Sequence, residues 1–216
     1  MDLDFSISNE ELLGLCKQQD QEALRVLLRR HERPIYSMLY RMLSNHEDAE
    51  EALAEVFVKV WRGAANFKGD SKFTTWLFRI AANTARDVLR SRRSRPEVSI
   101  EEIIFDESEH EGSQIGNPVK SALLAEDRSQ IMKAMQQLSE DDRLLITLYH
   151  FQECDYDEMV AITNIPSANL KVKLFRARQR LKMHCAQQEK KDADEDELRT
   201  NTAESSGLRR GAAERA

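Results

Sequence analysis

Residues 71–80, SKFTTWLFRI, combine aromatic rings and positive charge within one short segment. Phe73 and Trp76 offer flat apolar surfaces, and Lys72 and Arg79 supply the charge. Aromatic rings stack on nucleobases and cations contact phosphates, so this mixture suits a surface for unpaired nucleic acid. A core helix with one solvated side is the alternative that the segment by itself leaves open.

A second set of residues with an informative spacing lies at 156–182, which has the form of a helix-turn-helix. A short helix, YDEMVAIT, leads through the turn NIPSAN into a longer helix, for which Ser167 is well placed as the N-cap. Leu170, Leu174, Ala177 and Leu181 recur at helical spacing and predict one buried stripe. The bases left on the remaining surface are Lys171, Lys173, Arg176, Arg178, Arg180 and Lys182.

A helix of this type docks in the major groove of DNA, where its N-terminal residues reach base edges. Asn169 suits an adenine edge and Lys173 a guanine. The later arginines are better placed for phosphates, which give affinity without sequence information. A solvated basic helix packed on two others is the alternative for this segment.

The charge is unevenly distributed along the chain. The formal net charge of −6 by itself argues against a nucleic-acid binder. However, residues 86–95 carry a net +4 and residues 167–184 a net +6, while residues 97–127 between them carry −8. Two basic helical patches separated by an acidic spacer are therefore predicted.

The elements that must position these residues are helices. Only seven glycines and four prolines occur in 216 residues, and helix-forming residues abound, which indicates an all-α protein. Apolar runs do not reach the roughly 18 residues that a membrane span needs, so no membrane insertion by this chain is expected. The first residues, MDLDFSISNEELLG, lack the basic start of a secretory signal, so a cytoplasmic protein is expected.

The chain divides by composition into two helical domains joined by a flexible acidic linker. We predict a first domain over 8–95, a linker over 96–120, a second domain over 121–185 and a disordered tail over 186–216.

Four helices are predicted in the first domain. Ser8 and Glu11 have the spacing of a capping box, so a helix should begin there. A second helix begins near Gln21, and Pro34 should kink or split it. A third covers 48–62, and the fourth includes SKFTTWLFRI and runs into the arginine cluster, which Pro96 should end.

Three segments together resemble one known family. Residues 124–184 resemble region 4 of the sigma-70 family of RNA polymerase sigma factors, which reads the minus-35 promoter element. DAEEALAEVFVKVWRG and NFKGDSKFTTWLFRIAANTARDVLRSRR are similar to successive parts of region 2. With only these two regions and a short acidic linker, the plan resembles that of the extracytoplasmic-function (ECF) type, and of its RpoE-like group.

The resemblance implies three binding surfaces. In region 2, the surface that captures and melts the minus-10 element would comprise Phe67, Lys68, Ser71, Trp76, Arg79, Asn83, Arg86 and Arg90. The surface that contacts the clamp helices of the largest subunit of core RNA polymerase would comprise Asp48, Glu51, Leu53, Glu55, Phe57 and Lys59. In region 4, the minus-35 surface would comprise Ser167, Asn169, Lys171, Lys173, Phe175, Arg176 and Arg178. The family also implies a contact of region 4 with the polymerase flap and control by an anti-sigma factor.

The residues from Trp76 to Arg90 in the minus-10 set have spacings that place them on one helix face. Within SKFTTWLFRI we therefore predict Phe73, Leu77 and Ile80 as core, and Trp76 and Arg79 on the DNA side.

Enzymatic chemistry is not indicated, because the sequence has no P-loop, nucleophile–base pattern or metal-ligand spacing. The three cysteines, Cys16, Cys154 and Cys185, lie far apart and form no C-x-x-C pair. We therefore expect no cofactor, no bound metal and no disulfide framework. Two alternatives stay open: a DNA-binding regulator that acts without polymerase, and a helical scaffold with two solvated basic faces.

Overall fold

The computed structural model describes residues 7–18, 20–94 and 128–213, and the regular secondary structure in these residues is helical. The expected all-α fold is thus confirmed for the described part of the chain. The predicted linker, 96–120, lies outside the described residues. Within the described part, no helix is both long and apolar enough to cross a bilayer.

Four helices form the N-terminal unit, which we define as residues 7–94. They are α1 (Asn9–Lys17), α2 (Gln21–Leu43), α3 (His46–Ala64) and α4 (Phe73–Ser94). The predicted capping box is present, because Ser8 and Glu11 exchange side-chain-to-backbone hydrogen bonds at the start of α1. Asp20 and Asn45 cap α2 and α3 through their side-chain oxygens.

Pro34 does not divide α2, contrary to one form of our prediction, and the helix runs unbroken from Gln21 to Leu43. Proline removes one backbone hydrogen bond from a helix interior. Here Ile35, Met38 and Leu39, which follow it, are fully buried. Burial of this apolar stripe against the neighbouring helices offsets the lost bond.

The C-terminal unit, residues 128–191, contains a helix over 128–136, then α6 (Glu140–Ile146), a π-helical turn η2 (Thr147–Phe151), α7 (Tyr156–Thr163) and the first half of α8 (Ser167–Ala213). The helix-turn-helix is formed as predicted. Asn164 ends α7 in the left-handed conformation, with φ of 58°, a conformation that asparagine tolerates better than most residues. Leu170, Leu174 and Ala177 are fully buried, so the predicted stripe is the packed face of α8.

Both ends of α8 differ from the sequence-based expectation. Ser167 is the first helical residue rather than the cap, and the carbonyl of Pro166 accepts the first hydrogen bonds, from the backbone of Asn169 and Leu170. At the other end we predicted a disordered tail over 186–216, whereas α8 continues to Ala213. This stretch contains no proline and many helix-forming residues, so local propensity supports a helix there.

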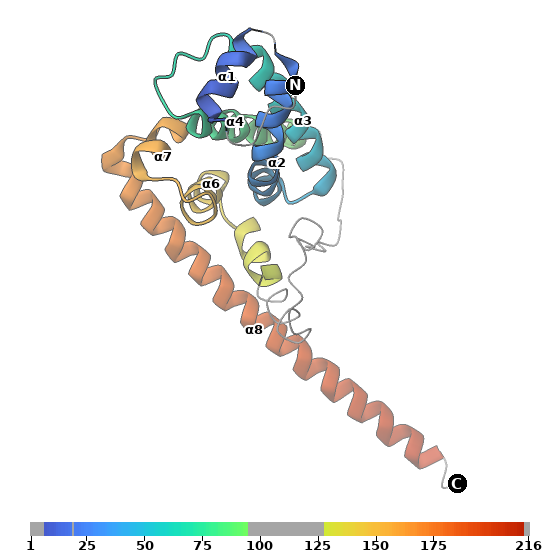
Figure 1. Ribbon diagram of the computed structural model, residues 1–216. Coiled ribbons are helices and arrows are strands. Elements are labelled where there is room, and N and C mark those ends of the chain that lie inside the picture. Colours follow the sequence, from blue (N-terminus) through green and yellow to red (C-terminus); the bar gives the residue numbers. More distant parts are fainter. Residues whose placement is uncertain (1–6, 19, 95–127, 214–216) are drawn as a thin grey trace.

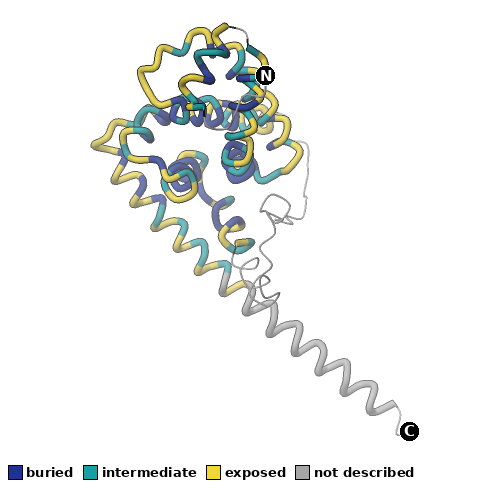
Figure 2. The backbone as a smooth tube through the Cα atoms, viewed as in Figure 1, coloured by how far each residue is buried: buried dark blue, intermediate teal, exposed yellow. Residues whose placement is uncertain are grey.

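The two units pack against each other. In Figure 1, α7 lies beside α4 and α6 lies beside the lower end of α2, while α8 runs along the C-terminal unit and extends away from the body. Buried apolar side chains of both units belong to one hydrophobic cluster, and Figure 2 shows buried segments, in dark blue, in both units. The C-terminal unit therefore lies next to α4, the helix that carries the predicted minus-10 surface.

Candidate nucleic-acid interface

Trp76 is held in place by other aromatic residues at the N-terminal end of α4. Its ring centroid is 5.1 Å from that of Phe67 and 6.0 Å from that of Phe73. Gly63 of α3 lies directly beneath the indole, and a Cβ there would meet Trp76 Cζ2 at 2.9 Å. Trp76 is thus half-buried and positioned by packing, with one edge left accessible.

A pocket of about 480 Å³ opens beside this edge. One wall comes from the N-terminal unit and the other from the helix-turn-helix. The lining residues are Asp70, Ser71, Thr75, Trp76 and Arg79 on the first wall, and Val160, Ala161, Asn164 and Pro166 on the second. Of the predicted minus-10 set, Ser71, Trp76 and Arg79 therefore share one pocket.

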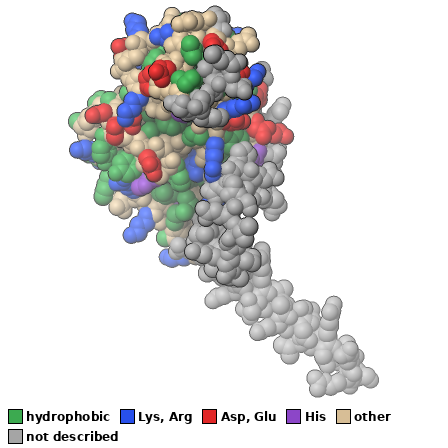
Figure 3. Space-filling model, in the orientation of Figure 1, with side chains coloured by type: hydrophobic (Ala, Val, Ile, Leu, Met, Phe, Trp, Pro, Cys, Tyr) green, Lys and Arg blue, Asp and Glu red, His purple; other side chains and the backbone are tan. Residues whose placement is uncertain are grey.

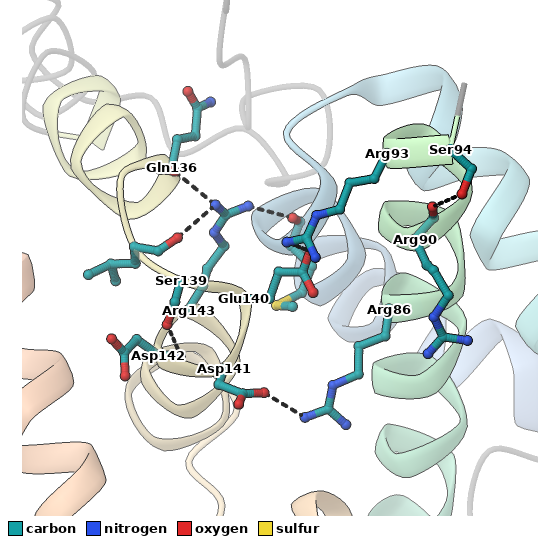
Figure 4. Close-up of polar contacts among 12 residues, drawn as sticks. Arg86, Arg90, Arg93, Ser94, Gln136, Ser139, Glu140, Asp141, Asp142 and Arg143 are labelled. Carbon is teal, nitrogen blue, oxygen red and sulfur yellow. Dashed lines mark hydrogen bonds and ion pairs between the residues drawn. The ribbon is translucent and has the colours of Figure 1, made fainter. Parts of the chain in front are cut away.

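Farther along α4, the predicted face becomes basic. Asn83 and Arg90 are exposed, and Arg86 is partly covered. Arg86 forms an ion pair with Asp141 of α6 at 3.2 Å, and Arg93 forms one with Glu140 at 2.6 Å (Figure 4). The structure thus places Trp76, Arg79, Asn83, Arg86 and Arg90 along one helix, and acids of α6 already contact its basic end.

Loop residues 65–72 connect α3 to α4 and carry the rest of the predicted minus-10 set. Phe67 is half-buried, and its carbonyl accepts a hydrogen bond from Lys17 Nζ at 2.7 Å. Lys68 and Ser71 are exposed. Lys72 bonds Glu158 of α7 at 2.9 Å, and this hydrogen bond and the charge of Glu158 raise the pKa of Lys72.

Two classes of side chain occur on the predicted minus-35 face of α8. Ser167, Asn169, Lys173, Phe175 and Arg176 are exposed, with Phe175 at 59%. Lys171 and Arg178 instead contact their own unit, since Lys171 Nζ lies 5.4 Å from the Tyr156 ring centroid and Arg178 lies 4.4 Å above Tyr149.

Arg178 also donates a hydrogen bond from Nε to His150 Nε2, 3.0 Å away. Burial, and then the charge of Arg178, lower the pKa of His150. The neutral imidazole can accept this bond, whereas a protonated one cannot. Arg178 is consequently oriented by the helix that precedes the helix-turn-helix.

Sequence reasoning did not include two exposed valines that lie next to the predicted site residues. Val172, 50% exposed, lies beside Lys173 on the same open side of α8 as Phe175. Val58, 47% exposed, lies on α3, seven residues after Glu51. Both positions fall outside the buried stripes, so the helical period could have identified them.

The predicted polymerase-binding set on α3 is divided by the fold. Glu51 and Glu55 are exposed, while Leu53 and Phe57 are half-buried and pack against the core. Asp48 pairs with Arg92 of α4, and Lys59 contacts both Glu55 and the buried Thr84. Asp48 and Lys59 therefore hold α3 to α4, which leaves Glu51, Glu55 and Val58 as the open part of this surface.

Charge is mixed over the molecular surface. On the face shown in Figure 3, Lys and Arg side chains lie among Asp and Glu side chains and do not form one uninterrupted basic area. This agrees with a chain whose net charge is negative and whose basic patches are local.

Comparison with known proteins gives two family matches. Residues 27–95 match sigma-70 region 2, and residues 128–181 match sigma-70 region 4. The chain is 31% identical over 174 residues to the RNA polymerase sigma-H factor of Pseudomonas aeruginosa, covering 79% of this chain and 90% of that protein. It is 32% identical over 176 residues to the ECF RNA polymerase sigma-E factor of Escherichia coli K12, covering 80% and 92%.

Two solved structures are also similar. The sigma factor RpoE, in complex with the anti-sigma factor NepR from Bartonella quintana, has a TM-score of 0.55 and 25% identity and covers 69% of this chain and 88% of that one. CnrH, in complex with the cytosolic domain of CnrY, has a TM-score of 0.58 and 20% identity and covers 81% and 95%. The similarity to CnrH, at 20% identity, supports the assignment of the fold alone.

Proposed function

Because this chain belongs to the sigma-70 family and is an extracytoplasmic-function sigma factor, we propose that α4 and α8 contact promoter DNA and that α3 contacts polymerase. The protein is a non-enzymatic subunit that binds core RNA polymerase and directs promoter-specific transcription initiation. The roles of individual residues in this activity are our proposal, and the observation that carries it is the composition of the open face of α4.

Minus-10 recognition is assigned to α4 and the loop before it. Melting a promoter requires that unstacked bases of one strand be held on π-faces while cations hold the backbone. Trp76 supplies a ring fixed by packing, and Arg79 lines the same pocket. Asn83, Arg86 and Arg90 continue the face, and Phe67, Lys68 and Ser71 complete it from the loop.

Minus-35 recognition is assigned to the first three turns of α8. The exposed side chains Asn169 and Lys173 suit base edges, because they lie near the N-terminus of the helix. Ser167, Phe175 and Arg176 are exposed on the same helix. Lys171 and Arg178, held against tyrosine rings, suit phosphate contacts that fix register.

Contact with the polymerase clamp is assigned to the outer surface of α3. Glu51 and Glu55 supply charge, and the exposed Val58 adds an apolar centre between polar neighbours. Interface energy is usually concentrated in such a centre rather than in exposed charges. In this proposal Asp48, Leu53, Phe57 and Lys59 support the surface by fixing α3 on the core.

We further propose that an anti-sigma factor controls this chain. We also propose that the chain acts in the cytoplasm. The support is the similar sigma factor RpoE, whose solved structure is a complex with an anti-sigma factor. The partner of the present chain would have to bind one or both units to compete with polymerase.

In vitro transcription tests the proposed function. Core polymerase is assayed on fragmented genomic DNA with and without the full chain, and start sites are mapped. The added chain should direct initiation to a small set of promoters that share minus-10 and minus-35 sequences. The proposal would be contradicted if core polymerase alone used the same start sites. It would also be contradicted if the free chain bound promoter duplexes as tightly and specifically as its complex with polymerase does.

A further inference from the structure

Three aromatic side chains form a row between α8 and the elements that precede it. Tyr149 and His150 belong to η2, and Tyr156 begins α7. The ring centroids of Tyr149 and His150 are 5.0 Å apart in an edge-to-face arrangement, and those of Tyr149 and Tyr156 are 5.8 Å apart. We call these three side chains the aromatic row, and contacts between neighbouring rings hold it together.

Each end of the aromatic row contacts a cation of α8. At one end, the guanidinium of Arg178 lies 4.4 Å above the Tyr149 ring, and its Nε donates to His150 Nε2 at 3.0 Å. At the other end, Lys171 Nζ lies 5.4 Å from the centroid of the Tyr156 ring. The row therefore connects two cations that are separated by about two turns of α8.

Lys171 and Arg178 lie on the same edge of α8. They are seven residues apart, close to two full turns, and each directly follows a buried residue, Leu170 or Ala177. Their edge lies between the buried stripe and the open side that carries Phe175. An α-helix is roughly 10–12 Å wide and the major groove about 12 Å, so each edge of a docked helix faces one sugar–phosphate strand.

The contacts of Arg178 orient its guanidinium without neutralising it. The bond to His150 uses Nε, and within the described part of the chain no hydrogen bond from Nη1 or Nη2 is found, so these donors remain for a phosphate. By contrast, Arg180 of the same helix pairs with the carboxylate of Asp142. A side chain that is held in place beforehand loses less rotamer freedom when it binds, which lowers the cost of association.

We propose that the aromatic row positions Lys171 and Arg178 to contact phosphates of one strand at the minus-35 element. His150 acts through Arg178, Tyr156 acts through Lys171, and Tyr149 joins the two ends. The inference rests on the phosphate role proposed above for the two cations. It adds three positioning residues, none of which belongs to the minus-35 set predicted from the sequence.

The salt dependence of DNA binding tests the positioning. Polymerase that carries the full chain is titrated with a duplex bearing the minus-35 element of a mapped promoter, at several salt concentrations between about 50 and 200 mM. Each lost phosphate contact should make the slope of log K against log salt shallower by about 0.9. At about pH 8 an imidazole is uncharged, so replacing His150 changes no charge. A shallower slope must then come from the position of Arg178, whereas a merely structural histidine would affect stability alone.

R178A defines the effect of one lost contact, which we expect to be a slope shallower by about 0.9 and an affinity about ten-fold lower. H150L should approach both changes, and so should H150F, because neither side chain accepts a bond from Nε. H150Q retains an acceptor and should keep the wild-type slope. The matched control is H184L, the same replacement six residues beyond Arg178 on α8, and it should also keep the wild-type slope.

Double variants test whether the aromatic row acts through the cations. H150L/R178A should bind no more weakly than R178A, and Y156L/K171A no more weakly than K171A. Additive losses in these pairs would contradict the proposal.

The single variants separate the positioning from the proposed function. A wild-type slope in both H150L and H150F, together with a shallower slope in R178A, overturns the positioning and leaves the phosphate contact of Arg178 in place. A wild-type slope in R178A itself overturns both the contact and the positioning. Failure of the proposed function as a whole would instead show as no promoter selection in the transcription assay.

Discussion

Arg143 donates a hydrogen bond from Nη1 to the main-chain carbonyl of Met42, 2.7 Å away, although the two residues are 101 positions apart. The same buried guanidinium also donates to the carbonyls of Met135, Gln136 and Leu138. One side chain thus satisfies carbonyls near the ends of two helices that belong to different units. Burial lowers the pKa of Arg143, but a guanidinium stays charged at neutral pH.

Substitution of Arg143 by lysine should therefore destabilise the fold. A lysine keeps the charge but cannot match the planar fork that reaches four carbonyls. We expect the free energy of unfolding to fall by about 2–4 kcal/mol, measured by urea denaturation. R62K, at an exposed position of α3, is the control and should change stability by less than about 0.5 kcal/mol. If R143K lowers the free energy of unfolding by no more than the control does, Arg143 does not stabilise the fold by capping these helix ends.

The Gly63–Trp76 contact predicts a second result. In G63A, the new Cβ meets the indole at 2.9 Å, so Trp76 must shift. We expect a changed tryptophan emission spectrum and slower open-complex formation with polymerase. G14A is the matched control, because a Cβ at this position of α1 meets nothing within 4 Å, and it should stabilise the protein by up to about 1 kcal/mol. Equal open-complex rates in the two variants would contradict the positioning of Trp76 by Gly63.

Asn83 offers the cleaner test of strand capture, because it is exposed on the same face as Trp76. N83A should slow open-complex formation roughly ten-fold, the loss expected when about 1.4 kcal/mol of contact energy is removed. Affinity for core polymerase should stay unchanged. W76A should slow melting too, but it should also lower stability by about 2–3 kcal/mol because the ring is half-buried. Loss of polymerase affinity in N83A would indicate a different role.

Lys173 and Arg178 should differ in promoter selection. K173A removes an exposed side chain near the N-terminus of α8 and should change base preference at one minus-35 position by about 1–3 kcal/mol. R178A should weaken binding evenly across sequences, because Arg178 is held against Tyr149 and His150. Both effects can be read from a randomised minus-35 library. If K173A weakens promoter binding equally for all minus-35 sequences, Lys173 contacts a phosphate and not a base.

His150 predicts a pH dependence of stability. Its pKa is lowered in the folded state, so the unfolded chain binds more protons as the pH falls below the ordinary value of about 6.5. Stability should therefore be highest above that value and decline as the pH falls through it. H150Q keeps a hydrogen-bond acceptor for Arg178 and should reduce this decline in urea midpoints. Burial also lowers the pKa of His31, so part of the decline should remain. Identical pH profiles for H150Q and wild type would contradict the assignment.

Several local features could be predicted from the sequence. The capping box at Ser8, the turn at Asn164 and the stripe of Leu170, Leu174 and Ala177 each depend on residues within a few positions of one another. Local spacing determines which side chains share a helix face. The long motif around Trp76 was distinctive enough to indicate the family, whereas the roles of single site residues remain predictions.

The tertiary structure decided which partner each of these faces meets. Periodicity marks a position as buried or exposed, but it does not identify the helix that packs on it. Thus the sequence predicted a kink or a split at Pro34, and packing keeps α2 in one piece. Asp48 was predicted as a polymerase contact, and the tertiary structure adds Arg92 as its partner. Likewise Arg86 was predicted to belong to the minus-10 surface, and only the docking of the C-terminal unit placed Asp141 against it. Pairings between residues so far apart in the sequence depend on how whole helices dock, and composition and spacing do not encode that docking locally.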